Sequence, residues 1–166
     1  MRNGRPLPPT SVDEVVIPDD VRDACRRLSD AGLLLVVVTN QPDIARRTTT
    51  WQTVDAINAH LTDELGLDAV YVCPHDDGHA CGCRKPAPGL LLGAAEEWGV
   101  DLTRSLMVGD RWRDIEAGRR AGVTAVWVRS DYHELPPVAP DHVVDRLLDV
   151  VPLVTSSGTA GEGSRQ

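Results

Sequence analysis

The segment from Cys73 to Pro86 constrains the fold of this chain most. It reads C-P-H-D-D-G-H-A-C-G-C-R-K-P and places three thiols and an imidazole within eleven residues. Three cysteines and one histidine are a common ligand set for a closed, tetrahedral structural zinc site. The spacing therefore predicts a structural zinc site with the ligands Cys73, His75, Cys81 and Cys83.

Other readings of this segment are less favoured. Cys81 and Cys83 are too close in sequence to bridge each other comfortably, and nothing in the chain resembles a secreted protein, so disulfides are disfavoured. His79 is a competing ligand, although a solvated position is favoured for it. Arg84 and Lys85 follow the last predicted ligand directly, so a bound ion would fix the directions of two cations.

Length and charge limit the kind of protein that this chain can be. Its 166 residues suffice for one domain with one core, expected over 1–152, with a Gly/Ser-rich disordered tail at 153–166. A net charge of −8 argues against nucleic acid as the main partner. The longest apolar run, Leu33 to Val38, is too short to span a membrane, and no signal peptide is recognised. We expect a cytoplasmic monomer.

Apolar patterns predict alternating helices and strands. Helices are expected from Pro18 to Gly32, over 50–65, over 89–98 and from 110 to about 121, with strands at 33–38, 69–72, 105–109 and 123–128 and a further small element at 143–151. Leu91, Leu92, Ala95 and Trp98 are expected to point inward, and Cys25 is expected in the core. Such alternation predicts an α/β domain with a mainly parallel sheet and right-handed crossovers.

Polar residues follow the predicted strands in three places. They are Thr39 with Asn40, Arg84 with Lys85, and Asp110 with Asp114. Because the carboxyl ends of parallel strands share one edge of a sheet, these groups can converge. Cations neutralise phosphoryl oxygens, hydroxyls and amides donate hydrogen bonds to them, and a carboxylate suits Mg²⁺. The pattern predicts a site for a phosphate with a divalent metal.

The residues alone leave several alternatives open. Thr39 and Asn40 fit a plain turn as well as they fit a binding site. Asp110 is also a suitable helix N-cap. Asp114 lies one helical turn further on, where it would hold Lys85, contact the metal through water, or be a solvated acid of the first turn.

Three motifs resemble the haloacid dehalogenase (HAD) superfamily. They read V-V-T-N-Q, then C-x-H-x5-C-x-C-R-K-P, then V-G-D-R-x-x-D, within a resemblance that runs from about Asp13 to about Val128. The zinc loop narrows it to small phosphatases with little or no cap domain. The resemblance implies a Rossmann-like fold and a magnesium-dependent phosphatase acting on a small sugar phosphate. Heptose bisphosphate is preferred over histidinol phosphate as the substrate.

The resemblance also implies roles for individual residues. Thr39 would stabilise the phosphoryl group and Lys85 would neutralise it during transfer. Asn40, Gln41, Arg84 and Arg111 would contact the substrate. Asp110 would bind Mg²⁺, with Asp114 in a supporting position, and the zinc held by the three cysteines and His75 would be structural.

The sequence departs from this family at one point. The resembled phosphatases attack phosphorus with an aspartate of a D-x-D-G motif on a central first strand, and no D-x-D-G occurs in this sequence. The sheet is therefore expected to lack its central strand, and the chain to have essentially no turnover by the family mechanism. A start site placed too late is the favoured explanation. The alternative is a non-catalytic, zinc-stabilised module that binds phosphorylated ligands.

Overall fold

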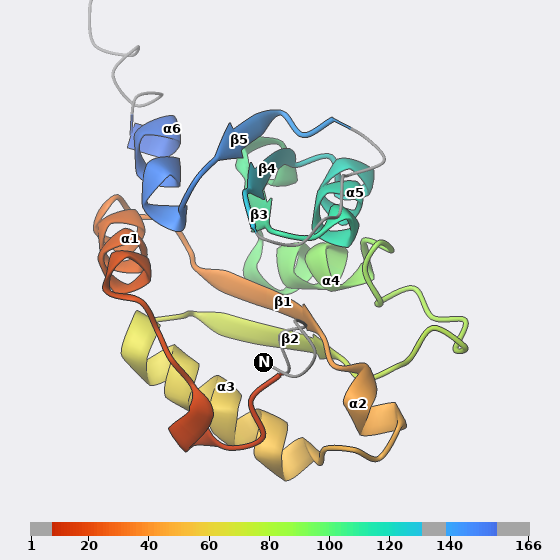
Figure 1. The fold of residues 1–166 in the computed structure, drawn as a ribbon. Coiled ribbons are helices and arrows are strands. Elements are labelled where there is room, and N and C mark those ends of the chain that lie inside the picture. The colour runs from red at the N-terminus through yellow and green to blue at the C-terminus, as the bar shows by residue number, and fades with distance from the viewer. Residues whose placement is uncertain (1–7, 131–138, 156–166) are drawn as a thin grey trace, which may run out of the picture.

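A computed structural model describes residues 8–130 and 139–155 of the chain (Figure 1). In chain order the elements are η1 (Val12–Glu14), α1 (Asp19–Asp30), β1 (Val36–Asn40), α2 (Pro42–Ala45), α3 (Trp51–Leu65), β2 (Ala69–Cys73), α4 (Gly89–Trp98), η2 (Leu102–Arg104), β3 (Leu106–Gly109), α5 (Trp112–Ala121), β4 (Thr124–Val128), β5 (His142–Val144), η3 (Leu147–Val150) and α6 (Val151–Thr155).

Helix boundaries follow from local chemistry. The side chain of Thr50 accepts a hydrogen bond from the Thr53 backbone N–H and so caps the start of α3. The end of α5 is at Gly122, whose φ of 79° is a left-handed conformation that glycine adopts without steric cost. This turn reverses the chain from α5 into β4.

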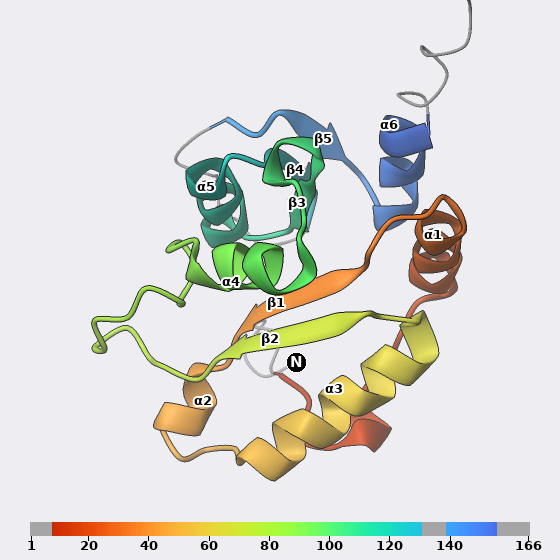
Figure 2. The same cartoon turned by 180° about the vertical axis from the view of Figure 1, so that it is seen from behind.

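The strands form two parallel sheets (Figures 1 and 2). One sheet pairs β1 with β2, and the other has the order β3–β4–β5, with every pairing parallel. Among the described residues no strand joins β1 to β3. The two sheets therefore present facing edges, one on β1 and one on β3.

A shared apolar cluster connects the two sheets. It contains Val38 of β1, Cys73 of β2, Leu90 of α4 and Met107 of β3, all buried. A second cluster lies between α5 and β4, and a third joins β4 and β5 to η3. Because the first cluster draws on both sheets, apolar packing holds them together without a strand between them.

The observed elements confirm the predicted α/β alternation and the buried position of Cys25. The strand expected at 33–38 lies instead at Val36–Asn40, so Thr39 and Asn40 belong to the strand itself. The inward face expected for α4 was wrong at two positions, since Leu92 is 46% and Trp98 40% exposed. The Trp98 indole N–H donates to the Tyr71 hydroxyl instead, which suits an amphipathic ring at a surface.

The small element expected at 143–151 is three elements, β5, η3 and the start of α6. The expected tail at 153–166 begins inside α6, and its residues 156–166 lie outside the described residues. No helix among the described residues has both the length and the apolar character needed to cross a bilayer.

Candidate active site and metal centre

Lys85 joins the segments that the sequence predicted to converge. Its ammonium donates to the Val38 carbonyl oxygen at 2.6 Å and pairs with Asp114 Oδ1 at 2.7 Å. The Lys85 and Asp114 side chains are only 12% and 9% exposed. The Val38 carbonyl lies on β1 and Asp114 on α5, so one side chain links a strand of the first sheet to the helix that follows β3.

The neighbouring Asn40 fixes the backbone of Lys85. Its side-chain amide donates to the Lys85 carbonyl at 3.0 Å, and its side-chain carbonyl accepts from the Lys85 N–H at 3.0 Å. Thr39 lies between Val38 and Asn40, and its hydroxyl accepts from Gln41 Nε2 at 3.4 Å. Thus Thr39 is held in the segment that contacts Lys85 on both sides, and Asn40 acts as a positioning residue.

Asp114 is anchored by the turn between β3 and α5. Its Oδ2 accepts a hydrogen bond from the Arg111 backbone N–H at 3.1 Å. A Cβ added at Gly109 would overlap the Asp114 side chain, so only glycine leaves room for the carboxylate there. Of the three alternatives left open for Asp114, the structure shows the contact with Lys85 and excludes a solvated acid, because the side chain is buried.

Asp110 follows the last residue of β3 and lies in the same charged neighbourhood. Burial raises the pKa of its carboxyl group, and the Asp114 carboxylate raises it further, while Arg111 and Lys85 act in the opposite direction. A half-buried carboxylate whose charged form is disfavoured is a suitable ligand for a hard cation. Arg111 lies beside it as the residue before α5.

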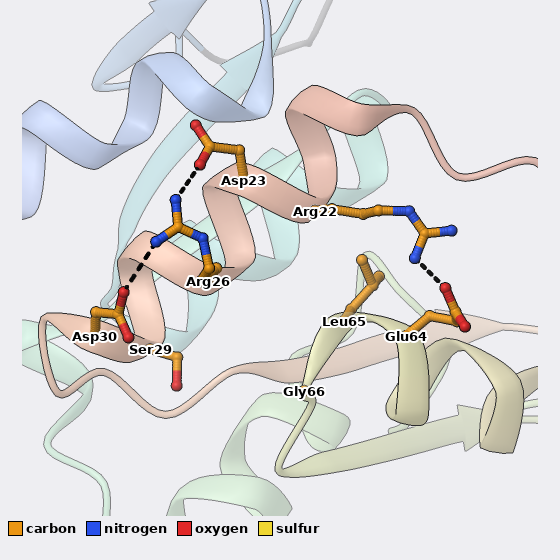
Figure 3. Close-up of a pocket in the computed structure, with 8 residues that line it drawn as sticks. All are labelled: Arg22, Asp23, Arg26, Ser29, Asp30, Glu64, Leu65 and Gly66. Atoms are coloured by element: carbon orange, nitrogen blue, oxygen red, sulfur yellow. Dashed lines mark hydrogen bonds and ion pairs between the residues drawn. The ribbon is translucent and has the colours of Figure 1, made fainter.

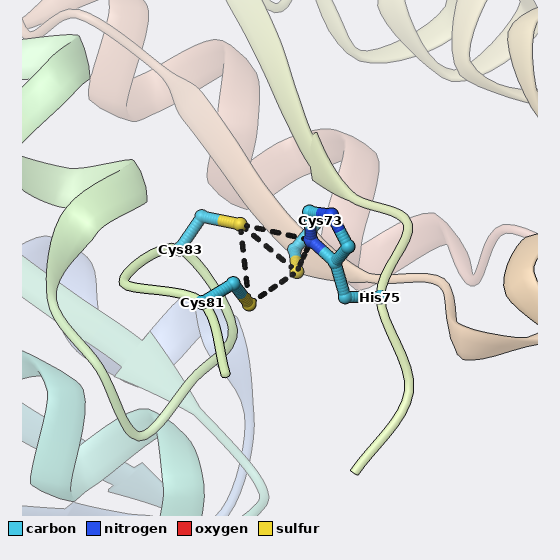
Figure 4. A group of neighbouring side chains, drawn as sticks. All are labelled: Cys73, His75, Cys81 and Cys83. Carbon is cyan, nitrogen blue, oxygen red and sulfur yellow. Dashed lines mark hydrogen bonds between the residues drawn. The ribbon is translucent and has the colours of Figure 1, made fainter. Parts of the chain in front are cut away.

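The four predicted metal ligands meet at one point (Figure 4). Their ligand atoms all lie within 4.8 Å of one another. The Cys83 sulfur is 3.2 Å from Cys73 Sγ, 3.6 Å from Cys81 Sγ and 3.4 Å from His75 Nδ1. His79 is not in this group and pairs instead with Asp76 at 2.8 Å.

This geometry fits a tetrahedral ion. Zinc–sulfur bonds of about 2.3 Å place two tetrahedral thiolates about 3.8 Å apart, close to the separations of 3.2 to 3.9 Å found among the three sulfurs. Burial and the neighbouring thiols raise the pKa of Cys83 to about 12. A divalent cation reverses that effect, because it stabilises the thiolates that repel one another without it. The group can therefore hold a metal ion.

Arg84 lies just before Lys85 and forms a second charged group. Its guanidinium donates from Nε and Nη2 to Asp77 Oδ1 at 3.0 and 2.9 Å, and from Nη1 to the His75 carbonyl at 2.9 Å. Arg46 and Arg113 also approach Asp77, at 3.9 and 3.7 Å. Of these arginines only Arg84 was expected at the site. Arg46 and Arg113 were missed because they come from other segments, the end of the unpredicted helix α2 and the first turn of α5.

A groove between α1 and α3 lies apart from these residues (Figure 3). Its charged side chains neutralise one another: Arg22 pairs with Glu64, and Arg26 pairs with Asp23 and Asp30. With its cations satisfied by its own carboxylates, the groove offers little to an anionic ligand.

Comparisons with known proteins agree with this arrangement. The profile of a family described as HAD-hydrolase-like matches residues 82–150. The chain is 39% identical over 132 residues to the D-glycero-beta-D-manno-heptose-1,7-bisphosphate 7-phosphatase of Yersinia pestis, covering 72% of this chain and 70% of the relative. It is 37% identical over 154 residues to the Escherichia coli K12 protein of the same name, covering 84% and 81%.

A solved structure supports the same assignment. The D,D-heptose 1,7-bisphosphate phosphatase of B. bronchiseptica, complexed with magnesium and phosphate, superposes with a TM-score of 0.81 and 29% identity, covering 90% of this chain and 89% of that one. Fold, motifs and relatives agree, and the chain belongs to the HAD superfamily of hydrolases, in the family of the heptose-1,7-bisphosphate phosphatases.

Proposed function

We propose that the chain is a magnesium-dependent phosphatase domain that binds D-glycero-D-manno-heptose 1,7-bisphosphate through Lys85, Thr39 and Asp110. The observation that carries this proposal is the nearly buried position of Lys85 between the Val38 carbonyl of β1 and Asp114 of α5. The choice of substrate follows the relatives named above, which are phosphatases of heptose 1,7-bisphosphate. Each residue then has a task that follows from its surroundings.

Lys85 is suited to hold a phosphoryl group. A lysine ammonium has three N–H donors, and two have acceptors here, the Val38 carbonyl and Asp114. Within residues 8–130 and 139–155 the third N–H has no acceptor, so it can donate to a phosphoryl oxygen. Because its side chain is nearly buried, its charge is less screened than a surface charge would be. The Thr39 hydroxyl, on the adjacent strand segment, would donate to the same group.

Asp110 would hold magnesium through a carboxylate oxygen, with water and phosphate oxygens as further ligands. When bound, the ion would neutralise charge on the phosphoryl oxygens. Among the described residues, the carboxylates at this end of β3 are Asp110 and the nearby Asp114. Asp114 is engaged by Lys85 and the Arg111 N–H. Asp114 thus serves Lys85, and Asp110 is left for the metal.

Zinc is the ion that we propose for the group of three cysteines and His75. Soft thiolates and an imidazole suit zinc, and a site with four protein ligands leaves no position for substrate. The ion would be structural. Its role would be to hold the loop that presents Arg84 and Lys85.

Binding without turnover is a second function, favoured by one observation. The 166 residues contain no D-x-D-G motif, so the aspartyl-phosphate of the resembled mechanism has no nucleophile among them. We expect the chain by itself to bind the sugar phosphate and leave it intact.

Turnover is tested by extending the chain at its N-terminus with an apolar strand that ends in D-x-D-G. Phosphate release is measured with heptose 1,7-bisphosphate and with histidinol phosphate. Hydrolysis of the heptose compound, lost when the first aspartate of the added motif becomes asparagine, is the expected result. Hydrolysis of histidinol phosphate alone would reassign the substrate, and hydrolysis of neither would contradict the phosphatase proposal.

A further inference from the structure

The metal loop and α5 make two charged contacts through consecutive residues. Lys85 of the metal loop holds Asp114 of α5. One residue earlier in each segment, Arg84 and Arg113 both face the Asp77 carboxylate. Since consecutive Cα atoms are about 3.8 Å apart, a second cationic group begins next to the proposed phosphoryl site.

The second group gathers three guanidinium groups around one carboxylate. Arg84 donates to Asp77 Oδ1 through two nitrogens, at 3.0 and 2.9 Å. The Nη2 of Arg113 lies 3.7 Å from the same oxygen, and the Nη2 of Arg46 lies 3.9 Å from Oδ2. Arg46 is also near Asp43 and Asp76, at 3.6 and 3.9 Å. Arg84 and Arg113, in contrast, have Asp77 as their sole carboxylate partner among the described residues.

The cations are better fixed than the carboxylate. The Arg84 side chain is 11% exposed and also donates to the His75 carbonyl. The Arg113 guanidinium lies 4.8 Å from the centroid of the Trp112 ring, a cation–π contact. Asp77, between them, is 63% exposed. An incoming anion would therefore meet placed donors and would have to displace only an exposed side chain.

We propose that Arg84 and Arg113, with Arg46 at the margin, bind the second phosphate of a bisphosphate substrate, and that Asp77 occupies this site until the phosphate displaces it. The proposal rests on the function proposed above, in which Lys85 holds the phosphoryl group that is transferred. It assigns Asp77 and Arg113 as residues that determine the preference for two phosphates over one.

Phosphate is a stronger partner than a carboxylate for these donors. It carries more charge and more acceptor oxygens, and arginine binds it in a bidentate manner. Asp77 is nevertheless a permanent competitor, because it is tethered next to the site. If it fills the site nine-tenths of the time, the apparent affinity for the second phosphate falls about tenfold.

The test is run in the presence of magnesium on the zinc-loaded chain. Its two probes are heptose 1,7-bisphosphate and the corresponding 7-monophosphate, which keeps the phosphate that the 7-phosphatase relatives are named for and lacks the second one. Dissociation constants are measured by isothermal titration calorimetry, and ³¹P NMR verifies that both probes stay intact. We expect Asp77→Asn to bind the bisphosphate about tenfold more tightly than the unmodified chain. We expect Arg113→Ala to bind it about tenfold more weakly, with the monophosphate changed less than about twofold in both variants.

Matched controls come from the exposed contact of Arg26 with Asp30 on α1, on the other side of the molecule from the metal loop (Figures 1 and 3). Asp30→Asn and Arg26→Ala remove the same charges and should leave both affinities unchanged. Zinc content and thermal melting verify that each variant is folded. If Asp77→Asn binds the bisphosphate no better than Asp30→Asn does, or binds both probes equally better, the inference is overturned.

A Lys85 variant separates this inference from the function on which it rests. The double variant Lys85→Met, Asp114→Asn removes the buried ion pair as a whole. If this variant binds neither probe and Asp77→Asn leaves both affinities unchanged, the proposed function is retained and the inference is overturned. If Asp77→Asn binds the bisphosphate more tightly but the Lys85 variant keeps its affinity for both probes, the proposed function is contradicted. If neither the unmodified chain nor Asp77→Asn binds either probe, both the proposed function and this inference are contradicted.

Discussion

At the scale of single residues, Lys85 and Asp114 form a buried pair in which each charge depends on the other. The pair has little exposed surface, and Asn40 fixes the lysine backbone. Lysine as a cation of the site could be predicted from the R-K-P motif. Its partner could not, because the sequence left three roles open for Asp114, one helical turn after Asp110. Its burial excludes the solvated acid, and its contact with Lys85 shows the first role.

Substituting Lys85 alone should destabilise the fold. Lys85→Met leaves Asp114 buried without its cation, and we expect a loss of about 3 kcal/mol in the free energy of unfolding. Adding Asp114→Asn removes the stranded charge and should restore most of that loss. Urea denaturation measures both variants, with Arg26→Met in an exposed ion pair as the control, expected to change stability by less than about 1 kcal/mol. If Lys85→Met is as stable as the Arg26→Met control, the Lys85–Asp114 pair is not buried in solution.

The titration of Asp110 provides a second test. Its pKa is raised, chiefly by burial and then by Asp114, so in the magnesium-free chain we expect its carboxyl ¹³C signal to titrate above the reference of about 3.9. A raised folded-state pKa means that the group's contribution to stability is fully present below the unfolded pKa and is lost as the pH rises through the folded one. Magnesium should move the titration to lower pH, and a titration at or below the reference value would contradict the assigned environment.

At the scale of elements, the metal loop and the β3–α5 turn bring the site together. The alternation of apolar runs predicted the four longer helices and the strands β1 to β4, because buried parallel strands and amphipathic helices have distinct patterns. The short helix α2 (Pro42–Ala45) was missed, since four residues carry no periodicity. The inward face of α4 was wrong at Trp98, whose indole N–H finds a partner at the surface.

Removal of the metal should release the loop between β2 and α4. We expect one zinc per chain, and a chelator should lower the melting temperature and abolish phosphate binding, since Lys85 follows the ligands directly. Cys73→Ser should cost more stability than Cys81→Ser, because Cys73 is also fully buried in the cluster shared by the two sheets. Metal analysis and thermal melting measure these effects, and equal melting with and without metal would contradict a structural ion.

The β3–α5 turn should not tolerate a side chain at Gly109. A Cβ there would overlap Asp114, so Gly109→Ala should cost about 1–3 kcal/mol and weaken phosphate binding by displacing the partner of Lys85. Gly93→Ala is the matched control: it lies in α4 with nothing within 4 Å of the added Cβ, and should gain up to about 1 kcal/mol. Urea denaturation compares them, and equal effects would contradict the close approach of Gly109 to Asp114.

At the scale of the whole molecule, the fold is two parallel sheets, and one lysine links β1 of the first sheet to α5, which packs on β3 and β4 of the second. The separation agrees with the prediction that a central strand is lacking, and β1 and β3 have no strand between them among the described residues. How the two halves hold together could not be predicted. That depends on Val38, Leu90 and Met107 meeting across the gap, and on Lys85 reaching the Val38 carbonyl.

The binding of inorganic phosphate with magnesium tests most directly whether these polar groups form one site. Isothermal titration of the zinc-loaded chain should give saturable binding at one site. The Lys85→Met, Asp114→Asn variant should lose at least about tenfold in affinity, Asp110→Asn should lose the dependence on magnesium, and Arg26→Met should bind as the unmodified chain does. Equal affinity in all four chains, or no saturable binding in any, would contradict a phosphate site at the ends of β1 and β3.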